Sequence, residues 1–302
     1  MRPVIVAGMH RSGTSAVARV LATLGMFLGA DLQGDHESRT FIALNEALLQ
    51  RYGATWDNPA AINRAWRTPA ELGALAAAAR RRLNGADGRA FLGRDTGWVD
   101  VTARAWGWKD PRNSFTLPLW RQVWPGAPVV QVTRNGIDVA ASLRRRHREV
   151  LARYRRVNGH DAPAAGFRLG TVPFTHRAAT LDGGFALWQE HEDNLARLRR
   201  AGRGPWLTVR YEDLVENPGQ EIERLAKFCA LAPPADAPET AARLLAGARP
   251  WRFTTDAELA GWAGRLLRAE TAWYGYAEDI AAALSAAPAG RRPDGRSVGG
   301  HD

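Results

Sequence analysis

Short apolar runs rich in β-branched residues alternate along the chain with longer stretches of helical periodicity. Four of these runs predict β-strands, at residues 4–7, 105–108, 129–133 and 206–209. The third run has the β-branched density of a strand that is buried on both faces, which is typical of a parallel sheet. Strands that alternate with helices predict an α/β fold of three α/β/α layers, with a mostly parallel central sheet covered by helices on both faces.

Apolar residues three or four positions apart, together with start and stop signals, predict the helices. The expected helices cover 16–24, 41–51, 69–83, 113–124, 135 onward, 181–201 and 218 onward. Thr68 and Asn217 each precede a proline, so a capping side chain and a proline at the first helical position coincide there. Asn135 is expected to cap the helix that follows the third strand.

The length and the apolar content indicate one large domain. The chain has 302 residues, of which 45% are hydrophobic, and this is enough to bury a sizeable core. We expect a single domain over residues 1–286 and a disordered tail over 287–302, where Gly, Pro and Arg predominate. Periodicity weakens over 147–180, and two interpretations stay open for this segment: a lid over an acceptor site, or a solvated insertion. No run approaches the roughly 18 apolar residues of a membrane span, so a cytoplasmic protein is expected.

Charge and cysteine content narrow the classes of function. The net charge of +10 attracts polyanions, which makes nucleic acid one candidate partner. The basic residues are spread along the chain, however, and no zinc-finger, RRM or basic-zipper pattern accompanies them. The single cysteine, Cys229, lies in an apolar helical pattern and is expected to be a buried thiol. Disulfides and cysteine-based metal sites are therefore excluded, and no metal site is predicted.

The first strand leads into a loop that is suited to binding phosphate. Residues 8–15 read Gly-Met-His-Arg-Ser-Gly-Thr-Ser and precede a helix, so loop amides and the helix N-terminus point toward one place. The segment fits the P-loop pattern, except that Thr14 stands where the lysine is expected. Arg11 is the nearest cation and can bind phosphate or sulfate oxygens through its planar guanidinium.

Further charged and aromatic residues follow the other predicted strands. Lys109 comes after the second strand, Arg134 after the third and Tyr211 after the fourth. Because parallel strands end at one edge of the sheet, these residues are expected to lie near the phosphate loop. In a P-loop NTPase, an acid at the end of a buried strand helps to hold magnesium. Arg134 at such a position favours a polyanion bound without a divalent cation.

The loop from Gly8 to Ser15 resembles the 5′-phosphosulfate loop of the PAPS-dependent sulfotransferases, in the Arg-Ser-Gly-Thr variant shared by tyrosylprotein sulfotransferases and many bacterial sulfotransferases. The resemblance covers about residues 4–230, and it includes Lys109-Asp110-Pro111, Arg134 with Ser142, and the block that begins at Tyr211. It implies a P-loop-like fold. It also implies metal-independent, in-line transfer of a sulfuryl group from PAPS to a hydroxyl or amine acceptor, with PAP as the product.

The same resemblance implies roles for individual residues. The implied catalytic residues are Glu37 as the base, with Arg11 and Lys109 as cations that stabilise the transferring group. The implied cofactor-binding residues are Arg11, Ser12, Gly13, Thr14 and Ser15 in the loop, Arg134 and Ser142 at the 3′-phosphate, and Tyr211 at the adenine. Asp35 and His36 remain alternatives to Glu37 as the base. The C-terminal Arg-Lys-Gly segment of cytosolic sulfotransferases is absent, and Arg249 or Arg252 is a candidate replacement.

Two other classes of function stay open beside the sulfotransferase. A P-loop kinase is disfavoured by Thr14 and Arg134, and a non-catalytic nucleotide or nucleic-acid binder is disfavoured by the clustering of candidate groups at one sheet edge. We expect no nucleic-acid partner. The acceptor is a small molecule, a carbohydrate or a peptide that the sequence does not distinguish, and the oligomeric state is also left open.

Overall fold

A computed structural model of the chain describes residues 1–66, 68–93, 97–102, 104–170, 172–202, 204–269 and 271–286. The chain divides into two compact units, one from Met1 to Pro250 and one that begins at Trp251, and each is described here by itself. The single domain expected over residues 1–286 therefore stays a prediction, and the expected tail over 287–302 lies outside the described residues. No helix in the described part of the chain is long and apolar enough to cross a membrane.

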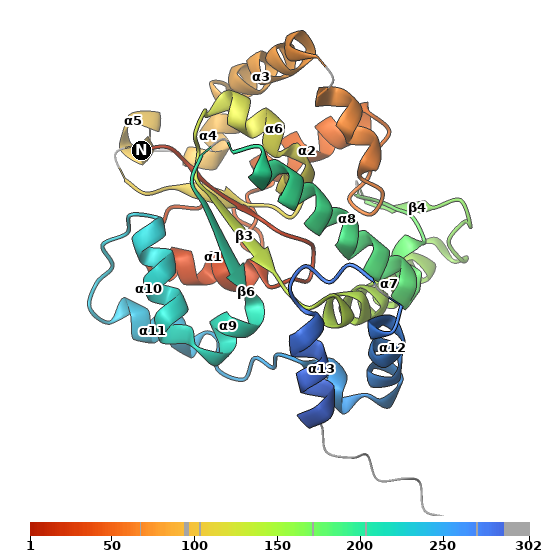
Figure 1. Cartoon of the computed structure of the whole chain (residues 1–302). Helices are drawn as coiled ribbons and strands as arrows, with labels where there is room; N and C mark the ends of the chain where they lie inside the picture. Colours follow the sequence, from red (N-terminus) through yellow and green to blue (C-terminus); the bar gives the residue numbers. More distant parts are fainter. Residues whose placement is uncertain are drawn as a thin grey trace, which may run out of the picture. The chain divides into compact units, whose positions relative to one another are not determined.

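The first unit is built on a sheet of four parallel strands in the order β2-β1-β3-β6 (Figure 1). The strands are β1 (Val4–Ala7), β2 (Gly107–Lys109), β3 (Val129–Thr133) and β6 (Trp206–Arg210). All four predicted strands are present, and the predicted α/β class with a mostly parallel sheet is confirmed. The second strand begins two residues later than expected and includes Lys109, which places this side chain on the strand end itself.

Alternate residues of the central strands pack on opposite faces, because successive side chains of a strand point in opposite directions. Val4, Val6 and Val130 lie in the core beneath α1 (Thr14–Thr23), α10 (Pro218–Phe228) and α11 (Ala237–Arg243). Ile5 and Val129 lie in a second core with α2 (Arg39–Arg51), α3 (Pro69–Leu83), α6 (Asn113–Val123) and α8 (Leu181–Arg200). The helices above and below the strands in Figure 1 therefore form the two outer layers.

The remaining elements complete the described chain. The first unit also contains η1 (Ala60–Trp66), α4 (Ala86–Leu92), α5 (Trp98–Thr102), α7 (Gly136–Asn158), β4 (Phe167–Leu169), β5 (Val172–Phe174), η2 (Arg177–Ala179) and α9 (Tyr211–Glu216). The second unit contains η3 (Arg252–Thr255), α12 (Ala257–Leu267) and α13 (Ala277–Ala286). Cys229 is buried, and burial raises the pKa of its thiol to about 12, as expected of a structural cysteine.

Most of the predicted helix starts are confirmed by cap bonds. The Thr68 side chain accepts from the Glu71 amide, and the Asn135 side chain accepts from the Asp138 amide. The Asn217 cap is wrong in one respect, because its side chain accepts no cap bond although Pro218 does begin α10. The position of Pro218 at the start of α10 can be read from the local sequence. The cap bond of the Asn217 side chain also depends on the backbone conformation of Asn217, which the sequence does not reveal.

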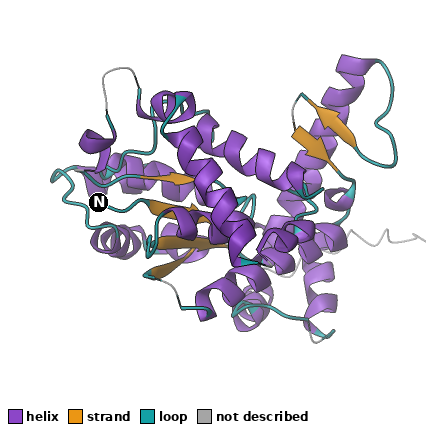
Figure 2. Cartoon of the chain, turned by 90° about the horizontal axis from the view of Figure 1, so that it is seen from above, coloured by secondary structure: helices purple, strands orange, loops and turns teal. Residues whose placement is uncertain are grey.

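The segment expected to lose regularity at residue 147 is more ordered than predicted. Helix α7 continues to Asn158, and the antiparallel hairpin of β4 and β5 follows it. Figure 2 shows this hairpin beside the end of a helix and away from the four-stranded sheet. Phe167 and Phe174 stack across the hairpin with ring centres 5.2 Å apart. Arginines on the solvent side of α7 had hidden its periodicity, because the apolar positions of this helix are few.

Candidate active site

The phosphate loop joins β1 to α1 in a backbone conformation that needs its two glycines. A Cβ on Gly8 would lie 2.2 Å from the carbonyl oxygen of Val132. Gly13 has φ +94°, and its added Cβ would lie 2.3 Å from a ring carbon of Tyr211. The loop is therefore closed tightly between β3 and α9, and a side chain at either glycine would obstruct it.

Ser12 holds the shape of this loop. Its hydroxyl donates to the Met9 carbonyl at 2.6 Å and lies 3.2 Å from the Val132 carbonyl. Its amide also donates to the Met9 carbonyl. The amide of Gly8 donates to the Ser114 hydroxyl at 3.2 Å, which ties the loop to α6. The buried hydroxyl of Ser12 thus supports the loop from within the protein.

Arg134, Ser142 and Tyr211 lie around the same loop. The Arg134 guanidinium is 4.5 Å from the centre of the Tyr211 ring, and its Nη2 donates to Asp138 Oδ2 at 2.7 Å. The Ser142 hydroxyl accepts from Arg11 Nε at 2.9 Å. These contacts connect three segments that are far apart in the sequence: the loop, the end of β3 with the start of α7, and the start of α9.

The two implied catalytic residues Glu37 and Lys109 are directly bonded. Lys109 Nζ donates to Glu37 Oε1 at 2.6 Å and to the Ser15 hydroxyl at 3.1 Å. The Lys109 side chain is only 1% exposed, so its charge requires this partner. Burial raises the pKa of Glu37 and Asp110 raises it further, whereas Lys109 acts in the opposite direction. The pair is held at the first turn of α1, where Thr14 is also buried.

The three candidate bases differ in their surroundings. Glu37 is buried against Lys109, whereas Asp35 is exposed. His36 has φ +57°, and burial lowers its pKa. Among the described residues, Asp35 and Glu37 line the adjacent pocket and His36 does not. The structure therefore brings Glu37 together with Lys109 and Ser15, and it leaves His36 outside this cluster.

A pocket of about 730 Å³ opens next to this cluster. The phosphate loop contributes Arg11 and Ser15, and Glu37 and Arg112 lie beside them. Much of the remaining wall comes from α7 and from the β4–β5 hairpin, and its residues from Glu149 to Phe174 lie within the segment 147–180 expected to cover an acceptor site. Whether this wall acts as a lid stays a prediction.

Several residues of the pocket were not singled out as site residues from the sequence, among them His10, Trp56, Arg112 and Arg146. Arg112 is buried and binds Asp110 and Glu46, and these carboxylates raise its pKa. Burial lowers the pKa of His10 well below its usual range, and its ring meets Trp56 edge-on at 4.7 Å. The position of Arg112 directly after Lys109-Asp110-Pro111 is a signal that could have identified it. The other three come together only through folding.

No group of three or more His, Cys, Asp or Glu residues suited to a metal ion occurs in the parts of the chain that the structure describes. The residues at the phosphate loop do fit an anionic nucleotide. Arg134 Nε is buried and has no hydrogen-bond partner within the described residues. Together with Arg11 and Lys109, it surrounds the loop with positive charge.

Solved structures and a family model are similar to this chain. Among solved structures, the chain is similar to sulfotransferase STF9 from Mycobacterium avium, with 13% identity, a TM-score of 0.49, and coverage of 83% of this chain and 69% of that chain. It is also similar to sulfotransferase STF1 from Mycobacterium tuberculosis, with 16% identity, a TM-score of 0.45, and coverage of 80% of this chain and 70% of that chain. No curated protein sequence matches it. A family model described as "Sulfotransferase family" matches residues 3–235, which is most of the chain, and the protein therefore belongs to the sulfotransferase family.

Proposed function

We propose that the protein transfers the sulfuryl group of PAPS to a hydroxyl or amine acceptor without a metal ion. The observation that carries this proposal is the contact of Lys109 with both Glu37 and Ser15. It brings a buried cation and a buried carboxylate to the phosphate loop at the carboxyl end of β2. If this loop binds phosphosulfate, Lys109 would stabilise negative charge and Glu37 would accept a proton beside the same sulfur atom.

The donor would be held by residues from three segments. Amides of the phosphate loop and the N-terminus of α1 would face the 5′-phosphosulfate, with Arg11 beside them. The unpartnered Nε of Arg134 and the hydroxyl of Ser142 would face the 3′-phosphate. Tyr211 would lie at the adenine, next to Gly13. The proposal also includes the resemblance of the phosphate loop to that of the tyrosylprotein sulfotransferases.

When it is bound, PAPS supplies a sulfuryl group on an activated phosphosulfate linkage: a new bond from the acceptor oxygen or nitrogen to sulfur forms, the bond from sulfur to the phosphate oxygen breaks, and PAP leaves. Glu37 accepts the acceptor proton at Oε2, because Oε1 accepts from Lys109 at 2.6 Å whereas Oε2 has only a long contact of 3.4 Å with Gln33 Nε2. Lys109 and Arg11 offset the negative charge that develops on the phosphate oxygen. Burial raises the pKa of Glu37 and so makes its carboxylate a stronger base, whereas Lys109 acts in the opposite direction and favours the ionised form.

The proposal is tested by thermal unfolding with PAP, ATP and ADP, each with and without magnesium. PAP at about 100 times its dissociation constant is expected to add about 2.7 kcal/mol to the free energy of unfolding. ATP and ADP lack a 3′-phosphate, so they should stabilise the protein far less, and magnesium should not be needed for PAP.

Arg134→Ala is the matched control, and it should reduce the difference between PAP and ADP. Equal shifts with PAP and ATP would contradict the proposal. ATP turnover that depends on magnesium would favour a P-loop kinase. Oligonucleotide binding with a steep salt dependence, and no binding of PAP, would favour a nucleic-acid binder.

A further inference from the structure

One face of α7 forms a continuous wall of the pocket. Arg146, Glu149, Val150, Arg153 and Val157 all line it. Their spacing of three, one, three and four residues keeps side chains on one side of a helix, and the eleven steps from residue 146 to residue 157 correspond to about 16 Å along its axis. A bound acceptor can therefore lie along α7, from the phosphate loop toward the end of the helix.

Arg146 is the first residue of this wall. It lies one turn beyond Ser142, the residue that accepts the hydrogen bond from Arg11. Its guanidinium carbon is 5.1 Å from the centre of the Trp56 ring. Within the described residues, Arg146 has no ion pair and no side-chain hydrogen bond, whereas Arg112 binds two carboxylates.

Among the described residues, Arg11 and Arg146 are not ion-paired with a carboxylate, although Asp35 and Glu149 also line the pocket and act on Arg11. Burial lowers the pKa of Arg146, and Arg11 lowers it further. Asp35 and Glu37 act in the opposite direction, but Glu37 is bonded to Lys109. Two neighbouring guanidinium groups that are not paired with a carboxylate favour an anion between or beside them.

The wall around Arg146 is aromatic and apolar. Trp56 and Phe174 are buried and meet edge-on, with ring centres 5.8 Å apart. Leu169 and Val172 of the hairpin also line the pocket. A guanidinium stacked on a ring keeps the N–H groups of its edge free, and these can bind a planar anion through two parallel hydrogen bonds.

We propose that the acceptor carries an anionic group beside an apolar or aromatic body, and that Arg146 binds this group. The inference rests on the proposed function for the identity of the reaction, but the binding of the anion does not depend on it. Arg146 stacks on Trp56 and, within the described residues, makes no hydrogen bond to the loop that would hold the donor. It is therefore a specificity residue for the acceptor, whereas Arg11 serves the donor.

The test uses two probes that differ in one charge. 4-Hydroxyphenylacetate and 4-hydroxyphenylacetamide share the same ring, hydroxyl and shape, and only the first is an anion. Their dissociation constants are measured by calorimetry, with and without PAP, for the wild type, Arg146→Gln and Arg148→Gln. Arg148 is an exposed arginine of the same helix that does not line the pocket among the described residues, so Arg148→Gln is the matched control.

The wild type and Arg148→Gln should bind the acid at least about tenfold more tightly than the amide, because the amide cannot form the charge-assisted hydrogen bonds between a carboxylate and Arg146. Arg146→Gln should bind both probes equally. In turnover with PAPS, Arg146→Gln should raise the KM for the acid and leave kcat within about threefold.

Equal binding of the two probes by the wild type, a preference that survives Arg146→Gln, or no binding of the acid would each overturn the inference. If PAP fails to bind, the proposed function fails instead. The comparison of acid and amide without PAP still decides whether Arg146 binds an anion.

Discussion

The phosphate loop, which we propose to hold the donor, and the wall of α7 and the β4–β5 hairpin, which we propose to face the acceptor, are built in different ways. At the phosphate loop, the candidate side chains are bonded to one another: the buried Lys109 donates to the buried Glu37, and the exposed Arg11 donates to the buried Ser142. On the acceptor side, Val157 is 68% exposed and Arg153 is also exposed, and the wall includes a hairpin of two three-residue strands. The core therefore determines the donor geometry, whereas surface segments that tolerate change determine the acceptor geometry.

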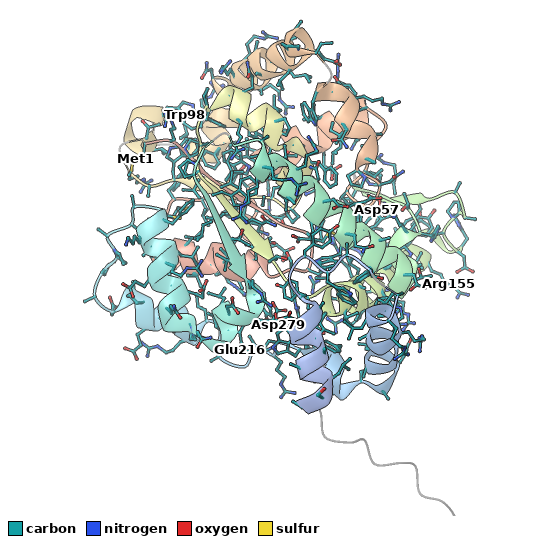
Figure 3. The ribbon with its side chains drawn as sticks, viewed as in Figure 1. Met1, Asp57, Trp98, Arg155, Glu216 and Asp279 are labelled. Atoms are coloured by element: carbon teal, nitrogen blue, oxygen red, sulfur yellow. The ribbon has the colours of Figure 1, made fainter. Side chains whose placement is uncertain are left out.

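Hydrogen bonds to residues outside the hairpin connect this segment to the rest of the first unit. The Asp57 carboxylate is fully buried and accepts from the Thr175 amide at 2.7 Å and from its hydroxyl at 3.1 Å. Figure 3 shows Asp57 on the side of the molecule where the hairpin lies. His147 Nε2 and His176 Nδ1 are 3.3 Å apart and join α7 to the same segment. Changes on the donor side should therefore affect catalysis directly, and changes on the acceptor side should act mainly through selectivity and local stability.

The largest effect is expected for Glu37→Gln. The variant retains a hydrogen-bond acceptor for Lys109 but loses the ability to take a proton, so the rate of the chemical step should fall by about 10²- to 10⁴-fold. Single-turnover kinetics with PAPS measure that step, and calorimetry should show PAP affinity nearly unchanged. Asp35→Asn is the matched control and should stay within about tenfold of the wild type. If His36→Gln is the inactive variant instead, the histidine is the base.

Substitution of Arg134 and substitution of Arg11 should affect different steps of the reaction. Arg134→Ala should weaken PAPS binding by about 10- to 100-fold, since it removes a charged hydrogen-bond donor that is remote from the reacting bond. Arg11→Ala should also slow the chemical step, because Arg11 lies on the phosphate loop. Saturating PAPS should restore turnover in Arg134→Ala and only partly in Arg11→Ala. Full recovery of both variants would mean that Arg11 contributes to binding alone.

Gly13 and Gly25 have the same φ, so substitution of each by alanine distinguishes the cost of backbone strain from the cost of a steric clash. Gly13 and Gly25 both have φ +94°, but only at Gly13 would a Cβ meet a neighbour, Tyr211, within 4 Å. Gly25→Ala should destabilise the protein by about 1 kcal/mol and leave PAP affinity intact. Gly13→Ala should cost more and weaken PAP binding by about tenfold, as measured by thermal unfolding and calorimetry. The double variant Gly13→Ala with Tyr211→Leu should regain part of the lost stability, and no recovery would show that the ring is not the cause.

The smallest expected effect is a change with pH in the local stability of the β4–β5 hairpin. His176 Nε2 lies 2.9 Å from the Pro163 carbonyl and must donate to it, so His176 Nδ1 accepts from His147. Burial lowers the pKa of His147 and His176 lowers it further, whereas Asp57 opposes them. The folded state thus binds fewer protons than the unfolded state, and this stabilisation is complete above about pH 6.5 and is lost as the pH falls through the lowered folded-state value.

Hydrogen exchange at the amides of Phe167–Phe174, corrected for the intrinsic effect of pH, should therefore speed up by up to about tenfold between pH 7.5 and pH 5. The β3 amides should not change in this range. His147→Gln should remove most of the difference at the hairpin. A hairpin whose protection is the same at both pH values would show that the two histidines do not hold it.

The sequence by itself determined the parts of the protein that contiguous residues encode. The glycines and the arginine of residues 8–15, the proline that begins α3 and the apolar run of β3 each act through their near neighbours. Parallel strands end at one edge of a sheet, so the positions of Lys109, Arg134 and Tyr211 after predicted strands were enough to assign them to the phosphate loop. The roles implied for these residues nevertheless stay predictions.

Only the tertiary structure decided which side chains touch. Glu37 and Lys109 are separated by 72 positions, and nothing in their local sequence distinguishes Glu37 from Asp35 as the partner of the lysine. The contact of Arg146 with Trp56 likewise joins two segments whose spacing carries no periodic signal. Local propensity and periodicity act over a few residues, whereas the position of a loop against a strand end depends on how the whole core packs. For this reason the phosphate loop could be predicted from the sequence, and the acceptor wall could not.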